Sequence, residues 1–88
     1  MDVVSPVRVT LLSKPGCHLC DAARDVVAEV IATTGVAASV EEVSILEDPD
    51  LNARYWDEIP VVLIDDRVHT IWRVDPERFA TALKEQNA

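Results

Sequence analysis

Positive charge is scarce in this chain of 88 residues, which has 8 Lys and Arg side chains against 16 Asp and Glu side chains. The formal net charge of -8 opposes sequence-independent attraction to nucleic acid phosphates and to anionic lipid. We therefore expect neither nucleic acid nor a membrane surface among the partners. An acidic surface mainly keeps a protein soluble, so any recognition of an anion depends on where the few cations lie.

Long apolar runs are also absent. No stretch approaches the roughly 20 apolar residues of a membrane-spanning helix, and residues 1–6 lack the positive charge that opens a signal peptide. A cytoplasmic location is the default expectation. Repeats, low-complexity stretches and internal linkers are lacking too, so residues 1–88 are expected to form a single small domain with one site.

Cysteine occurs only at Cys17 and Cys20. A disulfide across so short a loop stabilises little, and in a reducing compartment a Cys-x-x-Cys pair is more often catalytic or metal-binding than structural. A zinc site with nitrogen from His18 or His69 still lacks a second ligand pair, so we expect no metal unless two chains share it. Haem attachment is excluded because Asp21, not histidine, follows the second cysteine.

The first half of the chain predicts a strand followed by a helix. Residues 7–12 form a nearly continuous apolar run, typical of a strand that is covered on both faces. Residues 13–16, Ser-Lys-Pro-Gly, then break the strand. From Leu19 the apolar positions recur at the spacing of one helix face, and Gly35 is a suitable left-handed end for that helix.

The remaining elements are predicted by shorter signals. The first two are a strand over Val40, Val43 and Ile45 and a short helix from Asp48-Pro49 with Leu51 and Tyr55 facing inward. A hairpin follows, with strands over 61–64 and 67–72 joined by a turn at Asp65-Asp66. The last element is a helix from Asp75-Pro76 that packs Phe79, Ala82 and Leu83 and frays after Lys84. This order gives an α/β fold with a four-stranded mixed sheet, β-α-β-α-β-β-α. Trp56 and Trp72 are expected to pack structurally, with a place at the border of a substrate groove as the alternative. Arg67 and Arg73 are expected to be solvated, and they are the first places to seek an anionic ligand.

The predicted position of Cys17 at the start of a helix is expected to make its thiol reactive. A strand that runs into a helix through Pro15-Gly16 delivers Cys17 to the helix N-terminus, where unpaired amides and the macrodipole favour an anion. Cysteines in such positions can have the thiol pKa lowered to roughly 3.5 to 7.5, against about 8.5 for a free cysteine. Because the thiolate is the nucleophile, we assign Cys17 as the attacking residue.

Cys20 lies one helical turn further on, where it can attack a mixed disulfide formed on Cys17 and release the reduced partner. We therefore assign Cys20 as the resolving thiol. A protonated His18 would stabilise the Cys17 thiolate, and Lys14 would do the same from the preceding loop. The alternative for both is a solvated side chain.

The segment Ser13-Lys14-Pro15-Gly16-Cys17-His18-Leu19-Cys20-Asp21 resembles the opening motif of the small glutaredoxin-like proteins. Together with Ile59-Pro60 ahead of the third expected strand, and with the order of elements, it makes essentially the whole chain similar to the thioredoxin fold and to glutaredoxins in particular. The resemblance implies a glutaredoxin-like, thioredoxin-like fold whose cysteine pair carries redox chemistry.

The resemblance also implies a substrate-binding surface. It implies that Pro60 is a cis-proline beside the cysteines, with the backbone of Ile59 free to bind an extended substrate segment as an added strand. Lys14 matches the basic residue that glutaredoxins place ahead of the first cysteine to meet a carboxylate of glutathione. His18 and Leu19, between the cysteines, complete the expected substrate-binding residues.

The sequence departs from the glutaredoxin pattern at two places that concern glutathione binding. Leu19 stands where glutaredoxins commonly have an aromatic residue, and residues 73–75, Arg-Val-Asp, stand where a Gly-Gly-Asp segment lets the backbone approach glutathione. Asp75 is more simply a helix N-cap. The first strand also lacks the buried acidic residue of thioredoxins. No bound cofactor is required, and the external thiol reductant is glutathione or another thiol.

These features predict a monomeric thiol-disulfide oxidoreductase that reduces protein disulfides or mixed disulfides. Its partner is then a disulfide-containing protein or a low-molecular-weight thiol. The alternative is a non-catalytic module of the same fold that holds a protein partner at the edge near Ile59-Pro60, with cysteines that merely oxidise. Alkylation of Cys17 as a function of pH distinguishes the two.

Overall fold

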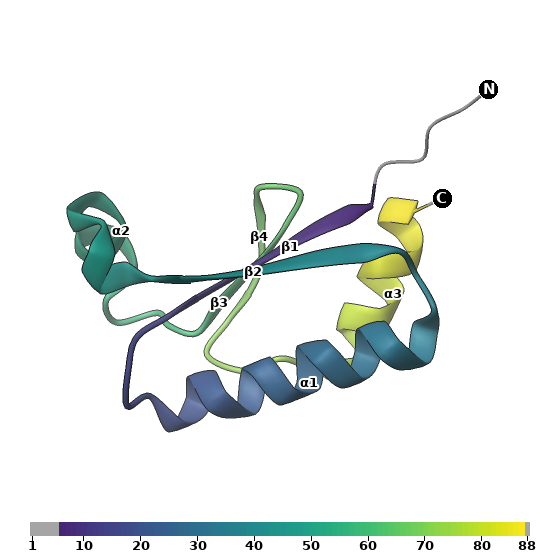
Figure 1. Cartoon of the computed structure of the whole chain (residues 1–88), viewed down its shortest axis with the longest axis horizontal. Helices are drawn as coiled ribbons and strands as arrows, with labels where there is room; N and C mark the ends of the chain where they lie inside the picture. The colour runs from purple at the N-terminus through teal and green to yellow at the C-terminus, as the bar shows by residue number, and fades with distance from the viewer. Residues whose placement is uncertain (1–5, 88) are drawn as a thin grey trace.

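The computed structural model describes residues 6–87; residues 1–5, where we expected no signal peptide, and Ala88 lie outside it. Figure 1 shows the elements in chain order. They are β1 (Val7–Ser13), α1 (His18–Thr34), β2 (Ala38–Ser44), a 3-10 turn η1 (Ile45–Glu47), α2 (Pro49–Tyr55), β3 (Val61–Ile64), β4 (Arg67–Ile71) and α3 (Pro76–Asn87). The expected order of strands and helices is confirmed.

β1 is a central strand of a four-stranded mixed sheet with the order β2-β1-β3-β4. It pairs in parallel with β2, from Val7 opposite Ala38 to Ser13 opposite Ser44, and antiparallel with β3. Because of the parallel pairing, the carboxyl ends of β1 and β2 lie at the same end of the sheet, where α1 begins and where α2 follows (Figure 1). Cys17 and Cys20 lie at this end, at the start of α1.

Two apolar clusters hold the elements together. The larger lies where α1 and α3 cover one side of the sheet (Figure 1), with Val27 and Phe79 among its most deeply buried members. The smaller contains Leu12, Ile45 and Tyr55 and also includes Cys20. Since Leu11 and Leu12 are both buried yet belong to different clusters, the end of β1 is covered on both faces, as its apolar sequence predicts.

The predicted end of α1, the predicted start of α2 and the predicted turn after β3 are confirmed. Gly35 ends α1 with a φ of 70°, and the Asp48 side chain accepts hydrogen bonds from the N–H groups of Asp50 and Leu51 at the start of α2. The turn between β3 and β4 holds Asp65 and Asp66 at φ values of 47° and 69°, a conformation that aspartate tolerates.

Three expectations about these elements are wrong. Ile45 leaves the strand and opens η1, because the Ser44 side chain accepts a hydrogen bond from the N–H of Leu46 and caps that turn. The last helix continues beyond Lys84 to Asn87, since no helix breaker follows Lys84. The two tryptophans do not pack in the interior: 63% of Trp56 and 54% of Trp72 is exposed.

Phe79→Ala tests the coupling between α3 and the sheet. Phe79 is 0% exposed, so its truncation removes apolar contacts and leaves a cavity; we expect a loss of about 3–5 kcal/mol of unfolding free energy in urea denaturation. Thr81→Ala, on the exposed side of the same helix, is the control and should change stability by less than about 0.5 kcal/mol. Equal effects of the two substitutions would contradict the described packing.

Candidate active site

The cysteine pair begins where β1 gives way to α1. Gly16 has a φ of 78°, a left-handed conformation that favours glycine, and it turns the chain into the helix. Cys17 is the N-cap residue of α1, and its Sγ accepts a hydrogen bond from the N–H of Cys20 at 3.1 Å. The sulfur therefore occupies the place that a serine or aspartate oxygen usually takes at a helix N-terminus.

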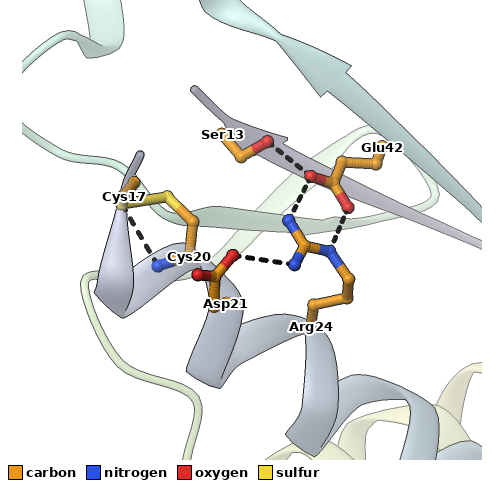
Figure 2. The surroundings of a disulfide bond; sticks show 6 residues. All are labelled: Ser13, Cys17, Cys20, Asp21, Arg24 and Glu42. Atoms are coloured by element: carbon orange, nitrogen blue, oxygen red, sulfur yellow. Dashed lines mark hydrogen bonds and ion pairs between the residues drawn. A yellow bond between two sulfur atoms is a disulfide. The ribbon is translucent and has the colours of Figure 1, made fainter. Parts of the chain in front are cut away.

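Cys17 and Cys20 form a disulfide, with their Cα atoms 5.2 Å apart (Figure 2). The environments of the two residues differ: Cys20 is 0% exposed within the smaller apolar cluster, whereas Cys17 is only partly buried against that cluster. Cys17 is therefore the more accessible of the two residues. The expected division into an attacking and a resolving thiol requires an asymmetry of this kind.

Ile59 and Pro60 lie beside the pair. Their peptide bond is cis, as the resemblance implies, and Ile59 belongs to the same apolar cluster as Cys17 and Cys20. Among the loop and cap hydrogen bonds of residues 6–87, none uses the N–H or the C=O of Ile59. The described loops and caps therefore leave both main-chain groups of Ile59 without a partner, and the residue as a whole is 8% exposed.

The other expected site residues lie around the cysteines on the surface. His18 is exposed as the first residue of α1, and Leu19 is 46% exposed. Lys14 is exposed in the loop after β1, where it lines a polar pocket of about 350 Å³ with Gly16 and Arg24. The structure thus gathers Lys14, His18 and Leu19 at one end of the molecule with the cysteines.

A network of polar side chains next to the disulfide was not predicted from the sequence (Figure 2). Arg24 on α1 binds both carboxylate oxygens of Glu42 on β2, at 2.6 and 2.7 Å, and also Asp21 at 2.9 Å. The hydroxyl of Ser13, which is 3% exposed at the end of β1, donates to Glu42 at 2.8 Å. The network therefore joins β1 and β2 to the first turns of α1.

The electrostatics of this network favour its charged form. The Arg24 guanidinium, together with the Ser13 hydroxyl, holds the pKa of Glu42 below its usual range, although burial acts in the opposite direction. The carboxylates of Glu42 and Asp21 in turn raise the pKa of the Arg24 guanidinium. The sequence gives one signal for this network, the adjacent glutamates at 41 and 42, which break the alternation expected of a strand. The residues that Glu42 contacts depend on the register of β1 and β2, which the sequence alone does not give.

Residues 6–87 contain no group of three or more His, Cys, Asp or Glu side chains arranged to hold a metal ion. Within the same residues, no helix is long and apolar enough to cross a membrane.

Fold and site together define a thioredoxin-fold protein with a Cys-x-x-Cys redox pair. Residues 8–84 match the Glutaredoxin-like domain (DUF836) family, and the chain belongs to that family. The glutaredoxin-like resemblance seen in the sequence is thereby confirmed.

Relatives with known sequences and structures agree with this assignment. The chain is 33% identical over 79 residues to the uncharacterized protein Rv0508 of Mycobacterium tuberculosis, covering 86% of this chain and 81% of that protein. It is 30% identical to a thioredoxin of Methanocaldococcus jannaschii, covering 94% and 99%. The X-ray structure of the target protein XcR50 from X. campestris superimposes with a TM-score of 0.66 at 27% identity, covering 88% and 96%. The solution structure of Ne2328 from Nitrosomonas europaea, 19% identical, gives 0.70 over 93% and 96% and supports the fold.

Glu42→Gln tests the polar network through its pH dependence. Because the folded pKa of Glu42 lies below the ordinary value of 4.5, the ionised carboxylate stabilises the folded state above that pH, and the contribution is lost as the pH falls through the lowered pKa. We expect the variant to be less stable by up to about 1 kcal/mol at neutral pH, and the difference to shrink toward zero in acid. Urea denaturation across that pH range measures it.

Glu41→Gln is the matched control. Glu41 is the exposed neighbour on β2, and no side-chain hydrogen bond or ion pair of residues 6–87 involves it. Its substitution should leave the pH dependence of stability unchanged. A Glu42→Gln effect that stayed constant from neutral to acid pH would contradict the ionic role of Glu42.

Proposed function

We propose that this protein is a thiol-disulfide oxidoreductase that reduces protein disulfides or mixed disulfides. The Cys17 thiolate attacks one sulfur of the substrate disulfide, that bond breaks, and the departing thiolate takes up a proton. The Cys20 thiolate then attacks the Cys17 sulfur and releases the second substrate thiol. Two electrons pass to the substrate, and the Cys17–Cys20 disulfide remains.

The observation that carries the proposal is the placement of the two sulfurs. The Sγ atom of Cys17 accepts the N–H of Cys20 at the N-terminus of a helix of 17 residues, where the helix dipole stabilises negative charge. Cys20 is buried directly behind it and is close enough for the two to form a disulfide. An inert structural pair would need neither the partial exposure of Cys17 nor its capping position.

An external thiol returns the protein to the dithiol form, and we propose that no dissociable cofactor takes part. Glutathione remains one candidate reductant, because Lys14 is exposed near the cysteines and available to a carboxylate. A cytoplasmic location and a monomeric state stay predictions. Equilibration against defined ratios of reduced and oxidised glutathione, with thioredoxin reductase as the competing electron donor, identifies the reductant.

Cysteine substitutions test the two roles separately. Cys17→Ser should abolish reduction of a disulfide substrate, because the attacking sulfur is lost. Cys20→Ser should retain the first attack and accumulate a mixed disulfide between Cys17 and the substrate, visible as an adduct by mass spectrometry of the intact protein. Wild-type rates in both variants on several disulfides would refute the enzyme hypothesis and favour the non-catalytic binding module.

Alkylation reports on the helix position of Cys17. In the reduced Cys20→Ser variant, the rate of reaction with iodoacetamide should reach half its maximum clearly below pH of about 8.5, the midpoint for a free cysteine, because the helix N-terminus favours the thiolate. His18→Ala in the same background shows whether the imidazole contributes. A midpoint at the free-cysteine value would indicate an unactivated thiol and again favour the binding module.

A further inference from the structure

An apolar groove of about 290 Å³ begins at Leu19, which lies between the two cysteines in the sequence, and shares no lining residue with the polar pocket. One wall is α1 from Leu19 to Val26, and the other is the segment that follows β4. The lining residues are Leu19, Ala22, Ala23, Val26, Trp72, Arg73 and Val74. The groove therefore starts two residues after Cys17 along the chain and continues along the helix.

Trp72 is held rigidly although 54% of it is exposed. Its φ of 67° lies in the left-handed region, which is unfavourable for a bulky side chain and persists only where surrounding contacts impose it. Its backbone N–H donates to the carbonyl of Pro60 at 2.8 Å, and its indole Nε1–H donates to the carbonyl of Asp57 at 2.9 Å. The indole is thus a fixed wall, attached to the segment that also carries Ile59.

Arg73 supplies the only charge among the residues that line the groove. In the described part of the chain it makes no ion pair, whereas Arg8 and Arg24 are both paired with carboxylates. The nearest carboxylate along the chain, that of Asp75, accepts the N–H groups of Glu77 and Arg78 at the start of α3. A cation beside an apolar groove, in a chain with a net charge of -8, favours a ligand that is apolar with an adjacent negative charge.

We propose that Trp72 and Arg73 determine the substrate class of the oxidoreductase. The groove takes an apolar side chain next to the reacting cysteine of a protein segment, and Arg73 pairs with a carboxylate one or two residues further along that segment. This inference rests on the proposed function and adds the sequence that the enzyme prefers around the target sulfur.

A protein segment fits this surface better than a small thiol. The unused N–H and C=O of Ile59 offer strand-like backbone hydrogen bonds, which an extended peptide can satisfy while its alternate side chains point elsewhere. The hydrogen bond between Trp72 and Pro60 couples the groove wall to this backbone position. One rigid surface therefore binds the main chain at Ile59 and a side chain beside Trp72.

The test uses mixed disulfides between short cysteine peptides and thionitrobenzoate. The Cys17 thiolate attacks the peptide sulfur, coloured thionitrobenzoate leaves, and Cys20 then releases the peptide thiol with formation of the Cys17–Cys20 disulfide. Four peptides carry Leu or Ala next to the cysteine, each followed by Glu or Lys. The nitrobenzoate is common to all four, so its own contacts cancel when second-order rate constants are compared.

The reduced wild-type protein should react about tenfold faster with the Leu peptides than with the Ala peptides, because an apolar side chain is buried in the groove. Trp72→Ala should remove most of this preference, while Trp72→Phe, which keeps an aromatic wall, should retain part of it. Trp56→Ala is the matched control: Trp56 is 63% exposed but does not line the groove, so its loss should leave the preference unchanged.

Arg73→Gln should reduce the preference for Glu over Lys by about threefold, the size expected for an exposed ion pair. Arg67→Gln, an exposed arginine on β4 outside the groove, is the control. Equal wild-type rates for all four peptides, or equal losses in the Trp72 and Trp56 variants, would overturn the inference and leave the oxidoreductase intact. Release of thionitrobenzoate at the same rate by Cys17→Ser would instead overturn the proposed function.

Discussion

The site depends on one contact, the hydrogen bond from the N–H of Cys20 to the Sγ atom of Cys17. A helix N-terminus leaves its first amides without partners, and here one of them is satisfied by the sulfur that is best placed to react. The same geometry sets the two cysteines one turn apart, and the helix then places Cys20 in the apolar cluster under the sheet. Capping and the separation of a partly exposed from a buried cysteine therefore follow from one local arrangement, on which the proposed reactivity of Cys17 also depends.

The sheet holds this arrangement in place. β1 is paired on both sides, so its last residues are fixed by hydrogen bonds to β2 and to β3, and the turn at Gly16 starts from a rigid strand end. The Arg24–Glu42 pair adds a link from the second turn of α1 to the edge strand β2. Exposed ion pairs contribute little to stability, but through the hydrogen bond from Ser13 to Glu42 this pair also connects α1 to the end of β1, the strand that precedes the cysteines.

Much of the fold around the cysteines could be predicted from the sequence because it depends on local signals. The apolar run of β1, the Pro15-Gly16 break and the periodicity after Leu19 place Cys17 at a helix start without any knowledge of the sheet. The role of Glu42 could not be predicted from the sequence, because its contacts with Ser13 and Arg24 exist only in the observed parallel register. The exposure of Trp72 shows a related limit, since hydrophobicity does not reveal that its indole is held at the surface by a hydrogen bond to a carbonyl oxygen.

The two sides of the cysteine pair are chemically different, and this difference bears on glutathione. On one side Lys14, Arg24 and Glu42 line a polar pocket; on the other, Leu19 and Trp72 line an apolar groove. Where the glutaredoxin resemblance leads one to expect glycines that let a backbone approach a ligand, this chain has side chains that build a wall. A tryptophan held in a left-handed conformation is an unfavourable choice for filling space, because a glycine would adopt that backbone more easily. Its presence is understandable if the wall contacts the substrate, as we propose, and Arg73 and Val74, which stand in place of the two glycines, line the same groove.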